Sequence, residues 1–172
     1  MPSLIGRNKK RPVAGCACGG LFLVMGAMMT EKGAGSLSIR ACRLEDIDAV
    51  LELWRQAEAT PGVTDNADDL RRAVAESRAS VLVAEAGGQI VGSVIGTFDG
   101  WRGNIYRLAV HPDYRRRGIA RALVAEAESR LARQGAKRIT ALVEKDHPLA
   151  MRFWEAVGYR ADERIVRRVR NP

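Results

Sequence analysis

From residue 37 onward the apolar side chains follow two kinds of spacing, and each kind predicts a different element. Apolar residues at every second position, or in short runs rich in Val and Ile, indicate strands. Apolar residues three and four positions apart indicate helices. The expected strands are residues 37–40, 80–86, 90–98, 104–110, 138–143 and 165–169. The expected helices are residues 43–59, 66–78, 118–134 and 148–157.

The residues between these elements suit helix ends and tight turns. Asn66 and His147 stand where an N-cap is expected, and Pro148 fits the first position of a helix. Gly135 suits a C-terminal stop, and Gly87-Gly88 suits a two-residue hairpin turn. The predicted boundaries therefore agree with the spacing of the apolar residues.

The order of these elements predicts an α/β (α+β) fold with one mixed sheet. Three consecutive strands over 80–110 are joined by short turns, so we expect an antiparallel meander. The strand, helix and strand over 104–143 form a crossover, which makes its two strands parallel. We therefore expect a mostly antiparallel sheet with helices on both faces. No internal repeat and no second domain are indicated, so residues 37–172 form the expected domain.

Residues 1–36 differ from the rest in pattern. A basic stretch over 7–11 precedes a largely apolar stretch over 13–29, in the manner of a secretory signal. The apolar part is too short and too rich in glycine for a membrane span. Met25, Met28 and Met29 follow, each a candidate start. We expect residues 1–36 to be an extension that is either disordered or upstream of the true translation start.

Composition adds the class of protein and its compartment. An apolar content of 47% and a charged content of 28% describe a soluble globular chain. Half of the net charge of +8 comes from the basic stretch over 7–11, and the remainder suits a polyanionic small molecule without requiring nucleic acid. Cys16, Cys18 and Cys42 form no disulfide framework, and His111 and His147 lie too far from them for a zinc set. We expect a cytoplasmic protein with no metal.

The most informative stretch is the loop that opens the helix at 118–134, which reads Arg115-Arg116-Arg117-Gly118-Ile119-Ala120. The first N–H groups of a helix have no partner within the helix, and the helix dipole adds partial positive charge there. Gly118 and the small Ala120 let a phosphate approach the backbone closely. The stretch therefore predicts a pyrophosphate cradle, although three arginines also suit a solvated turn or a nucleic-acid contact.

Two motifs at the expected separation resemble those of the GNAT N-acetyltransferase superfamily, over nearly all of residues 37–170. The first is Arg115-x-x-Gly118-x-Ala120, at a strand-to-helix junction. The second is Ala150-x-x-Phe153-Trp154-x-x-x-Gly158-Tyr159. The chain resembles a small, single-domain bacterial member, with acetyl-CoA as cosubstrate.

The resemblance implies a splayed strand pair at the cofactor site. Backbone groups exposed by the splay would bind the pantetheine arm as an added strand. N–H groups from Arg116 to Ala120 would bind the pyrophosphate, with charge-assisted contacts from Arg115 and Arg117. The residues assigned to the cofactor are Leu108, Ala109, Val110, Arg115, Arg116, Arg117, Gly118, Ile119, Ala120, His147 and Trp154. Helix capping is a sufficient alternative explanation for His147, as is core packing for Trp154.

The catalytic residues of the family do not carry over. Trp154 stands where many relatives have a tyrosine that protonates the thiolate, and an indole N–H is not a useful acid. Asn104 and Leu142 stand where relatives carry acids. Tyr106, which shares strand parity with Asn104 and Leu108, is one substitute candidate. Glu144, just beyond the end of a strand, is the other, and a solvated loop acid is the alternative interpretation.

The resemblance predicts an enzyme of the acyltransferase class that transfers an acetyl group from acetyl-CoA to a primary amine. The acceptor is a small molecule or a peptide or protein N-terminus, which attacks the thioester directly. Residues 54–70 and 99–103 are expected to shape the acceptor pocket. Asp65, Asp68 and Asp69 either attract a cationic amine or serve as first-turn acids.

Two rival functions belong to other classes. A CoA-binding sensor would bind acetyl-CoA and release no thiol. A nucleic-acid binder would use the loop arginines with Arg164, Arg167, Arg168 and Arg170, but it lacks interleaved aromatic residues. We therefore expect acetyl-CoA and an amine as partners, no nucleic acid, no membrane, and a monomer or homodimer.

Overall fold

The computed structural model describes residues 36–171 of the chain. The predictions for residues 1–35, including the start site and Cys16 and Cys18, lie outside the described residues. Cys42 is a buried free thiol, and burial is the main cause that raises its pKa to about 11. Among residues 36–171, no helix combines the length and the apolar character needed to cross a membrane.

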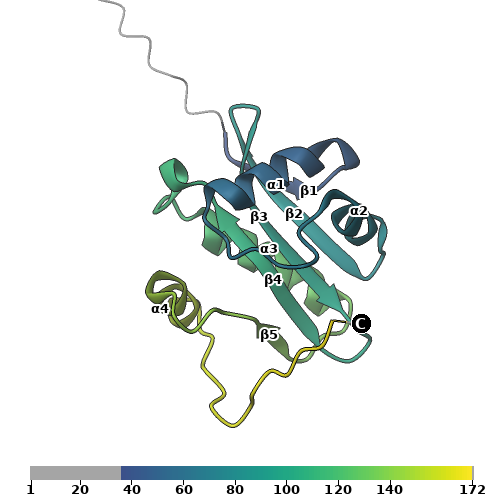
Figure 1. Ribbon diagram of the computed structural model, residues 1–172, viewed down its shortest axis with the longest axis vertical. Coiled ribbons are helices and arrows are strands. Elements are labelled where there is room, and N and C mark those ends of the chain that lie inside the picture. The colour runs from purple at the N-terminus through teal and green to yellow at the C-terminus, as the bar shows by residue number, and fades with distance from the viewer. Residues whose placement is uncertain (1–35, 172) are drawn as a thin grey trace, which may run out of the picture. The chain divides into compact units, whose positions relative to one another are not determined.

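A single mixed sheet organises the described residues (Figure 1). Its strands are β1 (Ser38–Ala41), β2 (Ala79–Ala86), β3 (Gln89–Phe98), β4 (Gly103–Val110) and β5 (Ile139–Ala141), and they lie side by side in that order. Neighbouring strands are antiparallel except β4 and β5, which are parallel. Gly87 and Gly88 both have positive φ values in the β2–β3 turn. The predicted meander and crossover are confirmed.

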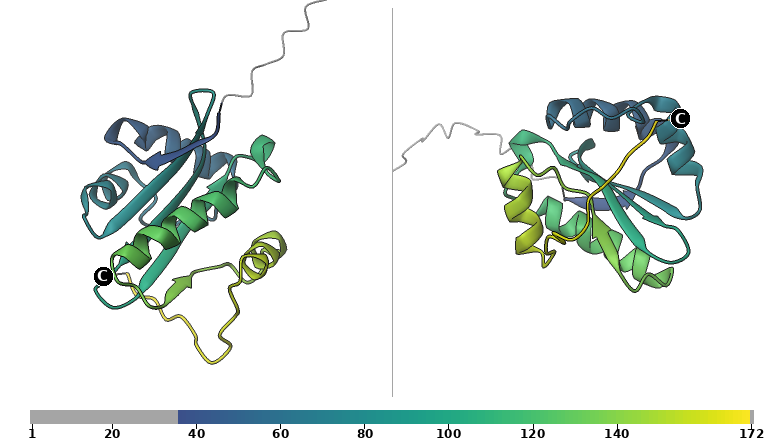
Figure 2. Two further views of the ribbon diagram at one scale, coloured as in Figure 1. Left: turned by 180° about the vertical axis from the view of Figure 1, so that it is seen from behind. Right: turned by 60° about the horizontal axis from the view of Figure 1, so that its bottom comes forward.

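Two layers of helices cover the sheet, one on each face (Figure 2). The helices are α1 (Ile47–Gln56), α2 (Ala67–Ala75), α3 (Ile119–Arg133) and α4 (Pro148–Ala156), with short 3-10 turns η1 (Leu44–Asp46) and η2 (Pro112–Tyr114). Consecutive side chains of β2 point to opposite faces of the sheet and pack in different core clusters. Leu82 packs in the core under α3, and Val83 packs in the core under α1 and α2. The predicted arrangement of helices on both faces is confirmed.

Both predicted N-caps are present. The side chain of Asn66 accepts a hydrogen bond from the Asp69 N–H at 2.9 Å, and His147 Nδ1 accepts one from the Ala150 N–H at 3.1 Å. Each bond satisfies one of the first N–H groups of its helix. Capping therefore accounts for both residues locally.

The predicted last strand, residues 165–169, is wrong. The described residues offer it no pairing partner, and the Ile165 N–H turns back to donate to the Asp162 carbonyl at 3.1 Å. Ile165, Val166 and Val169 stay 64–74% exposed. A strand-like pattern forms a strand only where a neighbour supplies hydrogen bonds and a surface to pack on. Arginines between these apolar residues favour solvent contact instead.

Candidate active site

The parallel strands β4 and β5 separate partway along their length. Their pairing covers only Gly103 with Ile139, Asn104 with Thr140 and Ile105 with Ala141. The last bond runs from the Leu142 N–H to the Ile105 carbonyl at 3.3 Å. From residue 106 to residue 110, β4 stays paired with β3 on its other side. The part of the chain that the structure describes thus leaves an open edge on β4, which we call the open edge (residues 106–110).

A β-bulge in β4 decides which side chains face each layer. The register with β3 shifts between Ser93 and Ile95, and Arg107 has a φ of 50°. Because the bulge inserts one extra residue, the side-chain alternation reverses after it. Tyr106 pairs with Ile95 on the face of α1 and α2, whereas Leu108 packs under α3 and α4. The expectation that Tyr106 and Leu108 share a face is therefore wrong.

The open edge leads directly into the predicted cradle. After η2, Arg116 and Gly118 have φ values of 64° and 79°, and α3 starts at Ile119. Ile119 is buried, which fixes the helix start against the sheet. Among the described residues, no group accepts a hydrogen bond from the backbone N–H groups of residues 116–121. Six consecutive free donors at a helix N-terminus suit an anion.

A glycine in β3 lets this helix approach the sheet closely. A Cβ at Gly92 would lie 3.0 Å from Ile119 Cγ2 and 3.0 Å from Leu123 Cδ1. A glycine inside a strand can signal such an approach, but Gly92 was not among the predicted site residues. That α3 is the element which approaches Gly92 depends on packing between segments far apart in the chain.

The arginines of the cradle differ in what they contact. Arg115 donates from Nε to the Val110 carbonyl at 3.4 Å and from Nη2 to the Ala57 carbonyl at 3.1 Å. Arg117 donates to the Asp113 carbonyl at 2.9 Å and lies over the Tyr114 ring. No described residue pairs with the Arg116 side chain. The basic cluster thus contains one arginine directed toward the end of α1, Arg115, and one without a partner among residues 36–171, Arg116.

The second motif lies on α4 and in the turn that follows it. Trp154 is buried and packs edge-to-face against Phe153 and Tyr159, with ring centroids 5.4 and 4.7 Å away. Gly158 ends the helix with a φ of 93°. These contacts agree with core packing as the role of the aromatic residues.

Residues 47–159 match the family model described as the acetyltransferase (GNAT) family. The chain is 38% identical over 123 residues to an acetyltransferase of Pectobacterium atrosepticum, covering 72% of this chain and 87% of that protein. It is 35% identical over 130 residues to an acetyltransferase of Sodalis glossinidius, covering 76% and 92%. The chain belongs to the GNAT family. It is thus an enzyme of the family that its two motifs indicated.

The fold of this GNAT protein matches solved acetyltransferase structures. The aminoglycoside N-acetyltransferase AAC(6')-Iy, solved in complex with CoA, superposes with a TM-score of 0.68. The alignment covers 84% of this chain and 100% of that chain at 16% identity. At this identity the likeness concerns the fold alone.

The two substitute catalytic candidates of this GNAT chain lie in different surroundings. Tyr106 is half-buried at the start of the open edge. Glu144 is exposed in the loop after β5, where its carbonyl accepts from the His147 N–H at 3.3 Å. Within residues 36–171 no hydrogen bond or ion pair involves either side chain, so the structure does not join them directly.

The three predicted acids at the start of α2 are each paired with an arginine. Asp65 pairs with Arg107, and Asp69 pairs with Arg72. Asp68 pairs with Arg71 at 2.8 Å. A carboxylate with an arginine partner attracts a further cation less strongly. These pairs favour the local structural role of the acids over a site for a cationic amine.

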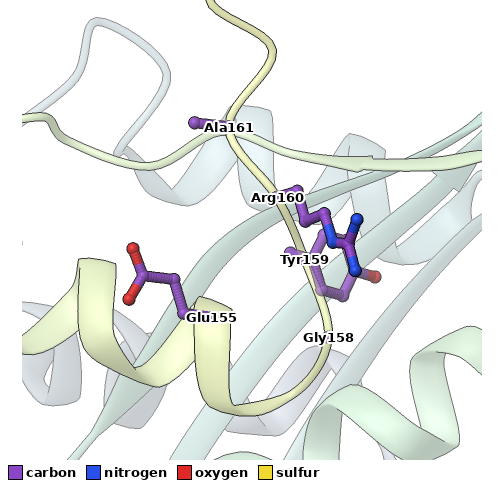
Figure 3. Close-up of a pocket in the computed structure, with 5 residues that line it drawn as sticks. All are labelled: Glu155, Gly158, Tyr159, Arg160 and Ala161. Carbon is purple, nitrogen blue, oxygen red and sulfur yellow. The ribbon is translucent and has the colours of Figure 1, made fainter.

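A pocket of about 420 Å³ lies at the C-terminal end of α4 (Figure 3). Glu155, Gly158, Tyr159, Arg160 and Ala161 line it. The Tyr159 hydroxyl donates to Glu128 Oε1 at 2.9 Å, and burial together with this bond raises the pKa of Tyr159. None of the lining residues belongs to the open edge or to the cradle. The pocket therefore reflects the end of the second motif and is not our candidate site.

Proposed function

We propose that the protein transfers the acetyl group of acetyl-CoA to a primary amine, by direct attack of the amine on the thioester. The observation that carries this proposal is the continuity of the open edge with the cradle. Residues 106–110 offer a strand edge that no described strand covers on the side away from β3, and residues 116–121 offer six free N–H groups. Acetyl-CoA has amide groups in its pantetheine arm and a diphosphate beyond them, in that order.

The residues fit this cosubstrate. The backbone of Leu108, Ala109 and Val110 would bind the pantetheine amides as an added strand. The N–H groups from Arg116 to Ala120 would hold the diphosphate, and Arg116 and Arg117 would add charge. Arg115 would add its charge beside the diphosphate while it keeps its bonds to the Val110 and Ala57 carbonyls. The CoA complex of AAC(6')-Iy, which shares the fold, supports this assignment.

The chemistry requires two proton transfers by the chain or nearby water. The amine nitrogen bonds to the acetyl carbon while the carbon–sulfur bond breaks, and the nitrogen loses a proton. Glu144 would accept that proton directly or through water, and Tyr106 would supply one to the departing thiolate. Trp154 and His147 would only border the cosubstrate, because one packs in the core and the other caps α4.

We expect Tyr106→Phe and Glu144→Gln each to lower kcat at least about tenfold while leaving the KM for acetyl-CoA within about twofold, since each removes a proton-transfer group. Thiol release across a panel of aminoglycosides, polyamines, amino acids and peptides would measure both. Glu155→Gln, an exposed acid at the other end of α4, is the control.

Unchanged turnover in both variants would indicate that a water relay, and not these two side chains, carries out the proton transfers. Binding of acetyl-CoA without thiol release for any amine in the panel would favour the sensor function over the enzymatic one.

A further inference from the structure

The loop between α1 and α2 (residues 57–66) is tied to the candidate site by two arginines. Arg107, in the bulge, donates from Nη1 to the Thr60 carbonyl at 2.8 Å and pairs through Nη2 with Asp65. Arg115, in the cradle, donates to the Ala57 carbonyl at 3.1 Å. One arginine comes from the open edge and the other from the expected diphosphate site. We call this loop with its two arginine contacts the clasp.

The ion pair between Arg107 and Asp65 is largely shielded from solvent. The side chains of Arg107 and Asp65 are only 23% and 16% exposed. Asp65 Oδ2 also accepts a hydrogen bond from the Gly62 N–H at 2.8 Å, so the carboxylate also binds the backbone of its own loop. A Cβ at Gly62 would collide with the Arg107 guanidinium. The loop backbone therefore lies directly on this arginine.

A rigid support lies beneath the arginine. The Arg107 guanidinium lies 5.5 Å from the centroid of the Trp54 ring, a distance at which a cation and an aromatic face attract. Trp54 Nε1 donates to the buried Ser93 Oγ at 2.8 Å. This links α1, β3 and the bulge in β4. The strained φ of Arg107 is maintained because several partners fix its side chain.

The clasp lies within residues 54–70, which the family resemblance already assigns to a wall of the acceptor pocket. We propose that Arg107 and Asp65 are positioning residues for the acceptor, because they hold this wall against the open edge. The inference rests on the proposed function, which places the thioester at the open edge. Arg107 starts that edge on the face of α1 and α2, where Tyr106 also lies. Loop residues that contact Arg107 are therefore held beside the reacting carbonyl. Because Asp65 is already paired, the wall selects acceptors by shape and backbone contacts.

The test compares Arg107→Gln and Asp65→Asn with the matched control Glu126→Gln. Glu126 also pairs with an arginine, Arg130, but it lies on α3 and its side chain is 35% exposed. We expect each clasp variant to raise the acceptor KM about tenfold, or ~1.4 kcal/mol. The KM for acetyl-CoA should stay within about twofold, since the cradle is unchanged. Hydrogen exchange of the amides in residues 57–66 should speed up in the free protein, which a change confined to substrate contacts would not cause.

A double variant and a conservative variant sharpen the result. The effect of the double variant should be smaller than the sum of the two single effects, because both substitutions remove the shared ion pair. Arg107→Lys should restore part of the acceptor KM, since it keeps the charge toward Asp65. An acetyl-CoA KM that rises as much as the acceptor KM would overturn the acceptor role. Unchanged exchange in the loop would overturn the clasp itself.

The exchange measurement separates failure of the clasp from failure of the proposed function, because it needs no turnover. Wild-type protein without acetyl transfer would overturn the function and with it the acceptor role. Normal turnover with an unprotected loop in the wild type would overturn the clasp alone.

Discussion

Replacing Gly118 by aspartate is expected to weaken acetyl-CoA binding by at least about 100-fold. A carboxylate about 5 Å from a phosphate costs roughly 3 kcal/mol at an effective dielectric constant near 20, which corresponds to about that factor. Gly118 has a φ of 79° and has open space where a Cβ would lie. The new side chain would therefore meet no protein atom there and would enter the space proposed for the diphosphate. Isothermal titration with acetyl-CoA measures the loss.

The chain offers a matched control for the backbone. Gly88, in the β2–β3 turn, has a φ of 78° and equally open surroundings. Gly88→Asp should carry the same left-handed strain, roughly 1–2 kcal/mol at most, and leave acetyl-CoA binding unchanged. Gly118→Asn separates bulk from charge, because asparagine also tolerates this conformation. We expect it to weaken binding less than the aspartate does. Equal binding by Gly118→Asp and wild type would refute the cradle.

The hairpin and the crossover could be predicted because their causes are local. Gly87-Gly88 allows the positive φ values of a tight turn, and the length between β4 and β5 accommodates a helix. The same holds for the backbone of the loop before α3, where Gly118 stands immediately before a helical pattern. In each case a few neighbouring residues determine the backbone.

The bulge and the clasp could not be predicted, because their causes are tertiary. Arg107 has a positive φ although arginine carries no local preference for it, and the partners that hold it lie far away in the chain. Thr60 is 47 residues before Arg107, and Trp54 reaches Ser93 across 39 residues. The prediction that Leu108 shares a face with Tyr106 was wrong because the bulge adds one residue to β4 between them. The prediction of a strand over residues 165–169 was wrong for the opposite reason, since a strand-like local pattern has no neighbouring strand to pair with among the described residues.

Asp46→Asn should destabilise the fold by about 2–3 kcal/mol near pH 7, because it removes the charge from a buried carboxylate that accepts three hydrogen bonds and leaves Arg40 with Glu85 as its remaining ion-pair partner. Arg40 donates to Asp46 Oδ2 at 2.6 Å and to Oδ1 at 3.0 Å, and the Arg43 N–H donates to Oδ2 at 2.7 Å. Asp46 is only 7% exposed. The bonds from Arg40 are the main cause that lowers the pKa of Asp46, against an opposing effect of burial.

The sign of the pH dependence follows from that lowered pKa. An unfolded aspartate titrates near pH 4, so Asp46 adds its full stabilisation above about pH 5. As the pH falls through the folded value, the carboxylate gains a proton and the stabilisation disappears. The free-energy difference between wild type and Asp46→Asn should therefore shrink steadily from pH 5 downward. Urea unfolding at successive pH values measures it.

Asp68→Asn provides the reference for an exposed pair and should change the free energy of unfolding by no more than about 0.5 kcal/mol at any of these pH values. Its side chain is 80% exposed beside Arg71, whereas the Asp46 side chain is 9% exposed beside Arg40. A pH-independent difference for Asp46→Asn would mean that its packing, and not its charge, stabilises the start of α1. A difference that grows toward acid would contradict the lowered pKa itself.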